Sequence, residues 1–117
     1  MTRSCSTGPL ARYLTQRNLT IFARIGTWDG SPDELERWIS RAREQVKPSV
    51  QQDPRLKAAF WLLDRDGGKG LIITVWESEG AMRASEPSRA RRQAATSAAT
   101  GAKVTTDRYE VVDYVII

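Results

Sequence analysis

With 117 residues, 40% of them hydrophobic, the chain is long enough for one domain with a modest core. Its net charge of +4 falls to +1 once residues 1–18 are set aside, because that stretch holds three arginines and no acidic residue. Charges of both signs are interspersed along the remainder, which argues against a nucleic-acid-binding surface. No stretch approaches the roughly 20 apolar residues that a membrane-spanning helix needs. We therefore expect no nucleic-acid partner and no membrane partner.

The numbers of cysteines and histidines limit the disulfides, catalytic arrangements and metal sites that the chain can form. The single cysteine, Cys5, cannot form a disulfide within the chain, and residues 1–18 lack the apolar core of a secretory signal, so we expect a cytoplasmic protein. The sequence contains no histidine, which excludes Ser-His-Asp and Cys-His catalytic arrangements. Only carboxylates then remain as abundant metal ligands, and they do not cluster, so we expect no metal and no cofactor.

The first part of the chain differs from the rest in composition and hydrophobic pattern. Residues 1–18 are rich in Ser, Thr, Gly and Arg without a hydrophobic period, and we interpret them as a flexible N-terminal extension. Residues 19–117 then form the domain. Its first strand is predicted over 19–27, where Ile, Phe, Leu and Thr are frequent, and a turn is predicted over 28–30.

The strongest local signal marks the start of the first helix. Ser31 stands at the N-cap, Pro32 at the first helical position and Glu34 three residues after Ser31, so that the Ser31 and Glu34 side chains can satisfy free backbone N–H groups. An apolar stripe at helical spacing follows, formed by Leu35, Trp38, Ile39, Ala42 and Val46. Pro48 is predicted to end this helix near Val46.

The second half of the chain predicts a hairpin, a helical region and a last strand. The hairpin strands cover 56–64 and 71–76, with glycines in the turn between them. The helical region runs over 77–85 and 88–99 and is interrupted at Pro87, and Gly101 can cap its end. A long last strand is predicted over 103–117.

Strand, helix, strand, strand, helix, strand is the order of the ferredoxin-like βαββαβ fold, an α+β arrangement with one antiparallel sheet and two helices on one face. The uncovered face of such a sheet is usually polar. Here the strands over 56–64, 71–76 and 103–117 carry apolar residues on both faces. We therefore expect a homodimer in which the second face packs against its own copy.

The layout resembles the dimeric α/β-barrel superfamily, and within it the antibiotic biosynthesis monooxygenase-like family. Besides the element order, the likeness rests on Ala23-Arg24 in the first strand and on Thr74-Val75-Trp76-Glu77-Ser78 at the end of the third. The phrase Trp-Glu-Ser-Glu at 76–79, followed by Ala81 and Met82 in a helix, is similar to that family as well. The likeness covers about residues 19–116.

The resemblance implies a pocket between the sheet and the helices. Active members of the family oxidise polycyclic aromatics there without a cofactor, and a related branch degrades haem. The resemblance also implies an Asn on the first strand, a Trp at the end of the third and, for haem, a His on the second helix. Here Trp76 occupies the Trp position and Ala23 the Asn position, and the absence of histidine excludes histidine-ligated haem.

Candidate residues for such a pocket are Trp76, Trp38, Tyr109, Ala23 and Arg83. The aromatic residues can equally fill the core and a dimer interface. The three arginines of the second helical region, Arg89, Arg91 and Arg92, are interpreted as a solvated helix face.

Two functions remain open. One is cofactor-independent oxidation of a small aromatic substrate, held as an anion in a dry pocket. The other is a non-catalytic dimeric module that binds a small hydrophobic ligand or has a structural or regulatory role.

Overall fold

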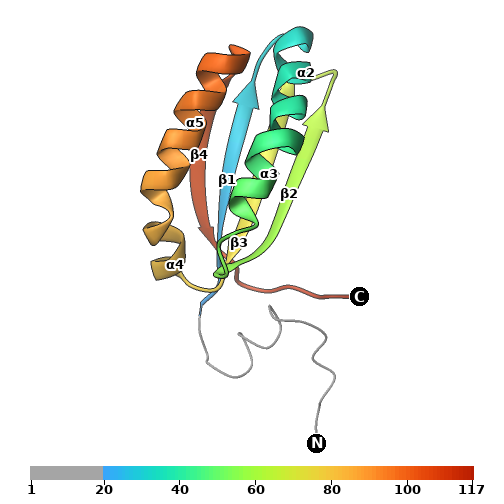
Figure 1. Ribbon diagram of the computed structural model, residues 1–117. Coiled ribbons are helices and arrows are strands. Elements are labelled where there is room, and N and C mark those ends of the chain that lie inside the picture. The colour runs from blue at the N-terminus through green and yellow to red at the C-terminus, as the bar shows by residue number, and fades with distance from the viewer. Residues whose placement is uncertain (1–19) are drawn as a thin grey trace, which may run out of the picture.

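The computed structural model describes residues 20–117, so the predicted N-terminal extension, Cys5 and the predicted start of the first strand lie outside the described residues. One antiparallel sheet contains the strands in the order β2-β3-β1-β4, and the helices lie together on one of its faces (Figure 1). The strands are β1 (Phe22–Asp29), β2 (Leu56–Asp64), β3 (Lys69–Trp76) and β4 (Lys103–Glu110). The predicted α+β ferredoxin-like fold is confirmed. No helix within residues 20–117 is long and apolar enough to span a membrane.

The central strand β1 runs on through residues that were predicted to form a turn. It pairs with β3 and β4 along its whole length, from Phe22 opposite Trp76 and Glu110 to Asp29 opposite Lys69 and Lys103. Trp28 is only 3% exposed, because it packs between the sheet and the helices. The turn prediction at Trp28 and Asp29 was therefore wrong.

The first helix begins where the sequence predicted. The N–H of Glu34 donates to Ser31 Oγ at 3.2 Å, and the N–H of Ser31 donates to Glu34 Oε1 at 2.8 Å. Helix α2 (Pro32–Arg41) then continues through a π-helical turn, η1 (Ala42–Val46), into α3 (Lys47–Val50). The prediction that Pro48 ends the helix was wrong, because Pro48 falls in the first turn of α3, where a missing N–H costs little.

The second helical region is broken close to the predicted place. Helix α4 (Glu79–Ala84) ends at Ser85, and α5 (Glu86–Thr100) begins directly after it with Pro87 in its first turn. Gly101 closes α5 with a φ of 84°, in the left-handed region that a glycine adopts without strain.

Strand β4 is shorter than predicted. Its last residue, Glu110, pairs with Phe22, the first residue of β1, so the described residues 20–117 offer no further strand for it to follow. One more hydrogen bond joins the Val111 N–H to the Ile21 carbonyl at 2.8 Å. Residues 111–117 lie outside helix and strand and project beyond the end of the sheet (Figure 1). The strand predicted for 103–117 is therefore wrong beyond residue 110.

The apolar core between the helices and the sheet is divided in two. One cluster combines Trp28, Trp38 and Ala102, with Ile39, Trp61, Ile72 and Val104 packed against it. The other combines Trp76, Ala81 and Met82, with Phe22 and Leu56 packed against it. Buried polar residues also occupy this layer, namely Arg24, Thr74, Ser85, Thr96 and Thr100.

The second face of the sheet is apolar in β2 and β3, as predicted, but the prediction was wrong for β4, where Lys103, Thr105 and Asp107 alternate to that face. Trp61 and Ile72 pack on the helix side, and strand alternation turns Phe60 and Leu62 to the opposite face. Phe60 and Leu62 are 54% and 46% exposed.

A glycine in β3 sets how closely Trp38 approaches the sheet. A methyl group at Gly70 would lie 2.5 Å from Cζ3 of Trp38. We expect Gly70→Ala to displace the ring and to lower the free energy of unfolding by about 1–3 kcal/mol. Gly80→Ala in α4 is the control, because the new methyl would meet no atom closer than 3.8 Å, and we expect it to be neutral or slightly stabilising. Urea denaturation at one protein concentration measures both, and equal stability of the two variants would contradict this packing.

Candidate functional site

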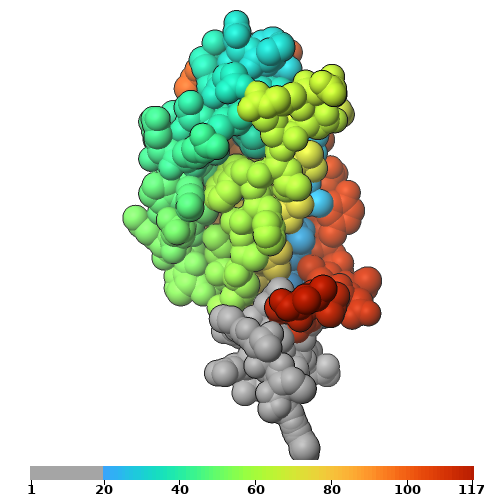
Figure 2. Space-filling model, turned by 90° about the vertical axis from the view of Figure 1, so that its right-hand side faces the viewer, coloured from blue at the N-terminus to red at the C-terminus, as the bar shows by residue number. Residues whose placement is uncertain are grey.

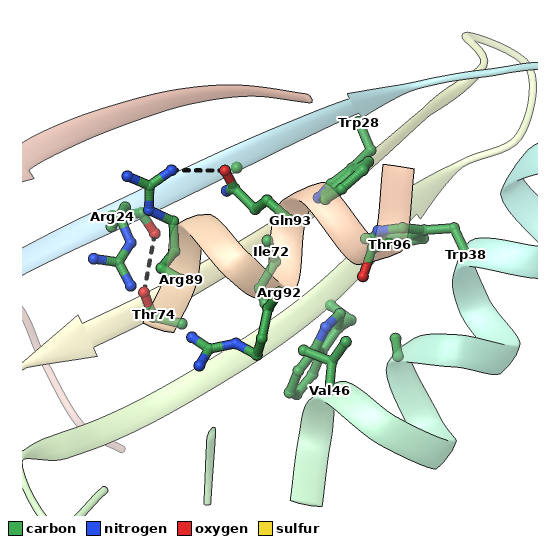
Figure 3. Close-up of a pocket in the computed structure, with 13 residues that line it drawn as sticks. Arg24, Trp28, Trp38, Val46, Ile72, Thr74, Arg89, Arg92, Gln93 and Thr96 are labelled. Atoms are coloured by element: carbon green, nitrogen blue, oxygen red, sulfur yellow. Dashed lines mark hydrogen bonds between the residues drawn. The ribbon is translucent and has the colours of Figure 1, made fainter. Parts of the chain in front are cut away.

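The hollows on the helix side of the sheet include an inner cavity and an outer groove that share a lining residue, Arg92. The inner cavity, of about 50 Å³, is lined by Arg24, Gly26, Trp28, Trp38, Ala42, Val46, Trp61, Ile72, Thr74, Arg89, Arg92, Gln93 and Thr96 (Figure 3). The outer groove, of about 520 Å³, is lined by Ser49, Val50, Gln52, Asp53, Pro54, Arg55, Trp76, Ala84, Ser85, Ser88, Arg91 and Arg92. The inner cavity has room for about one or two water-sized molecules, whereas the volume of the outer groove is typical of small-molecule sites.

Tryptophans form one end of the inner cavity (Figure 3). The rings of Trp28 and Trp38 lie 6.4 Å apart between centroids and are tilted by 41°. Gly26 keeps the floor open, because a Cβ there would lie 3.0 Å from Cγ2 of Ile72. The π-helical turn contributes Ala42 and Val46 to the wall, and such turns are frequent at functional sites.

A buried arginine forms the other end. Arg24 is 4% exposed, and its Nη1 donates to the Met82 carbonyl at 3.3 Å, to Ser85 Oγ at 3.0 Å and to Glu86 Oε2 at 3.0 Å. Its guanidinium carbon lies 5.4 Å from the ring centroid of Trp76, within the range of a cation–π contact. Burial lowers the pKa of Arg24 and the charge of Glu86 opposes that change, so the guanidinium stays charged.

The carboxylate of Glu86 forms ion pairs with three arginines at this end of the cavity. Glu86 accepts hydrogen bonds from Arg108, from Arg89 and from Arg24. Hydrogen bonding from Arg108, and then from Arg89, lowers the pKa of Glu86 to about 2, with the charge of Arg24 adding to the effect and burial opposing it. Glu86 is therefore ionised at neutral pH and is too weak a base to take a proton from a substrate.

The arginines of α5 do not form a solvated face, and that interpretation was wrong for two of them. Arg89 and Arg92 lie three residues apart on one side of the helix and line the inner cavity, whereas Arg91 stays exposed. Arg89 donates from Nη1 to Gln93 Oε1 at 2.7 Å, while its buried Nε has no acceptor among the described residues. Burial lowers the pKa of Arg92, and the charges of Arg89 and Arg91 lower it further.

The five residues that the sequence suggested for the pocket do not come together in one site. Trp38 lines the inner cavity, and Trp76 lines the outer groove and donates from Nε1 to Thr74 Oγ1 at 3.0 Å. Ala23 and Tyr109 pair with each other on β1 and β4, and alternation turns them to the face opposite the helices. Arg83 lies on the surface of α4 in a 2.7 Å ion pair with Glu79. Within residues 20–117, no three metal-ligating side chains come together.

An α+β ferredoxin-like domain with a hollow of ligand size between helices and sheet is the class that this fold and site define. The chain belongs to the antibiotic biosynthesis monooxygenase family, because residues 21–97 match the model of that family. The uncharacterised protein Rv2558 of Mycobacterium tuberculosis is 32% identical over 80 residues, which are 68% of this chain. The chain spans about a third of the length of that relative, since the match covers 33% of it.

Solved structures of low sequence identity share the fold. The monooxygenase ActVA-Orf6 of Streptomyces coelicolor, in complex with nanaomycin D, superposes with a TM-score of 0.66 at 16% identity, over 89% of this chain and 97% of that chain. SnoaB of Streptomyces nogalater, a cofactor-independent oxygenase, gives 0.61 at 17% identity over 80% and 95%. A dimeric ferredoxin-like protein from an uncultured marine organism gives 0.58 at 16% identity over 82% and 99%.

Glu86 makes the stability of the fold dependent on pH. We expect Glu86→Gln to lower the free energy of unfolding by about 3 kcal/mol at pH 7, because it leaves Arg24 buried without its carboxylate. The pKa of Glu86 is depressed from 4.5 to about 2, so this stabilisation is complete above pH 4.5 and is lost as the pH falls toward 2. The difference between wild type and variant should therefore shrink over that range in chemical denaturation.

The control for this experiment is Glu79→Gln, which removes an exposed carboxylate paired with Arg83. We expect this variant to lose less than about 1 kcal/mol at neutral pH. Equal losses in the two variants would show that Glu86 is an ordinary surface partner.

Proposed function

We propose that the protein binds a small aromatic substrate between the sheet and the helices and oxidises it without a cofactor. The observation that carries the proposal is the meeting of tryptophans and arginines at the two hollows, where the largely buried Trp76 borders the outer groove and Arg24 borders the inner cavity. Membership of the antibiotic biosynthesis monooxygenase family and the fold shared with a cofactor-independent oxygenase support it.

The chemistry follows from the charges. An aromatic substrate that reacts with dioxygen unaided must itself donate electrons, and a phenolate donates them far more readily than a phenol. Guanidinium groups stabilise the phenolate and lower the pKa of the phenol, so it loses its proton to water without a protein base. The net reaction converts a phenol and O₂ into a quinone and water, with one oxygen atom added to the ring and two hydrogens leaving in the water.

The sizes of the two hollows assign them different roles in this proposal. The aromatic rings occupy the outer groove against Trp76, because the inner cavity of about 50 Å³ is smaller than a ring. The inner cavity then has room for a molecule of the size of dioxygen beside the substrate. The burial of Arg24 keeps the charge there in surroundings of low dielectric, where it acts strongly.

A non-catalytic module that binds a small hydrophobic ligand is the second candidate. It is favoured by the lining of the inner cavity, which contains no Asp, Glu, Lys, Tyr or Cys among the described residues and so offers no proton acceptor. The two candidates share the ligand and differ in whether oxygen is consumed.

We also propose that the protein is a homodimer that buries the second sheet face. Phe60 and Leu62 stand on that face with strand neighbours from β3, and an exposed apolar patch of this kind favours association. The C-terminal segment, red in Figure 2, adds Val112, Val115 and Ile117, which are exposed. A dimeric protein of the same fold supports the assembly.

Oxygen uptake with naphthols and hydroxyanthrones tests the catalytic proposal. We expect wild type to consume one O₂ for each quinone formed, and Trp76→Phe to lower the rate about tenfold by removing the indole that borders the groove and contacts Arg24. Tyr109→Phe, on the opposite sheet face, is the control and should keep the wild-type rate. Binding without oxygen uptake across the panel would leave only the non-catalytic module.

Sedimentation of Phe60→Glu tests the dimer. Phe60 is more than half exposed in the single chain, so a charge there should leave the subunit folded but should separate two packed sheets. We expect wild type to sediment as a dimer at micromolar concentration and Phe60→Glu as a folded monomer. Ala90→Glu, on the exposed side of α5, should remain dimeric. A monomeric wild type would contradict the assembly.

A further inference from the structure

Arg92 holds a position that no other described residue shares. Its side chain is part of the wall of the inner cavity and of the wall of the outer groove. In Figure 3 it leaves α5 toward the end of the cavity where Arg24 and Arg89 lie, away from Trp28 and Trp38. Arg92 therefore stands where the two hollows adjoin, within reach of a ligand in the outer groove.

The guanidinium of Arg92 forms no ion pair within residues 20–117. The neighbouring cations Arg24, Arg89 and Arg108 each form an ion pair with Glu86. Among the described residues, Asp53 is the only carboxylate that lines the outer groove, and it accepts three hydrogen bonds from Arg55.

No hydrogen bond or ion pair within the described residues involves Arg92, and the unfavourable charges of Arg89 and Arg91 act on it more strongly than the favourable charge of Asp53. The junction of the two hollows thus carries a half-buried positive charge that a negative group would stabilise.

We propose that Arg92 binds a carboxylate of the ligand, so that the site selects planar aromatic acids over neutral aromatics. The planar guanidinium offers two parallel N–H groups, which match the two oxygens of a carboxylate better than a single phenolate oxygen. The ring then lies in the outer groove against Trp76, and the acid group lies at the mouth of the inner cavity. This inference rests on the ligand position in the proposed function and not on the oxidation.

Binding of naphthalene-2-carboxylate and of its neutral amide, 2-naphthamide, tests the inference by tryptophan fluorescence and calorimetry at pH 7. We expect wild type to bind the acid at least about tenfold more tightly than the amide, as for a lost charge-assisted hydrogen bond. Arg92→Gln should remove that preference by weakening the acid alone, and Arg92→Lys should retain part of it. Because Arg92 has no partner in the described chain, circular dichroism should show both variants folded.

Arg43→Gln is the matched control, because it removes the same charge from an exposed position on η1 and should change neither affinity. Equal affinity of wild type for acid and amide, or an equal loss of both in Arg92→Gln, would overturn the role of Arg92 and leave the ligand site standing. Failure of wild type to bind either probe would overturn the ligand site as well. Acid selectivity without oxygen uptake would support this inference and contradict the oxidation alone.

Discussion

The guanidinium of Arg24 is the constraint around which the helix side of the sheet is arranged. Strand β1 places it in the layer between sheet and helices, where an unpaired charge would cost several kcal/mol. Hydrogen bonds stabilise this charge, and their acceptors are Glu86, Ser85 and the Met82 carbonyl. These acceptors lie at the junction of the two helices, so the contacts fix where α4 ends and α5 begins. A well-packed apolar residue would stabilise such a layer equally well. A retained buried charge in this position accordingly fits a site better than a purely structural core.

The polar inner side of α5 follows from the same constraint. Thr96 and Thr100 are buried, and α5 is held to α2 by hydrogen bonds from Arg41 to Thr96 Oγ1 at 3.0 Å and from Arg37 Nη2 to the Thr100 carbonyl at 3.1 Å. Gln93 joins α5 to Thr106 of β4 at 3.1 Å. Hydrogen bonds of this kind orient α5 relative to α2 but bury little apolar surface. Separating the two helices therefore costs less free energy than separating helices that pack through apolar side chains.

The sequence predicted the elements better than their ends. Capping at Ser31, the hairpin strands and the break near Pro87 are local signals, and local geometry decides them. The last strand ended early because its length depends on β1, which no local pattern reveals. The helix ran past Pro48 because a π-helical turn changed the hydrogen-bond register before it. For the site, three arginines close together in sequence suggested a solvated helix face. Their spacing already indicates otherwise, because Arg89 and Arg92, three residues apart, share one side of a helix and Arg91 lies on another.

The two faces of β1 and β3 give the sheet a double role. Their helix-facing residues, among them Arg24, Gly26 and Thr74, form the floor of the inner cavity, and their other face is apolar and suited to a second subunit. A sheet pressed against its copy is stiffer than one that faces water, because the side chains on both faces are then packed. In the proposed homodimer the floor of the inner cavity would therefore be packed from below, which is the rigid support that orienting a small ligand requires.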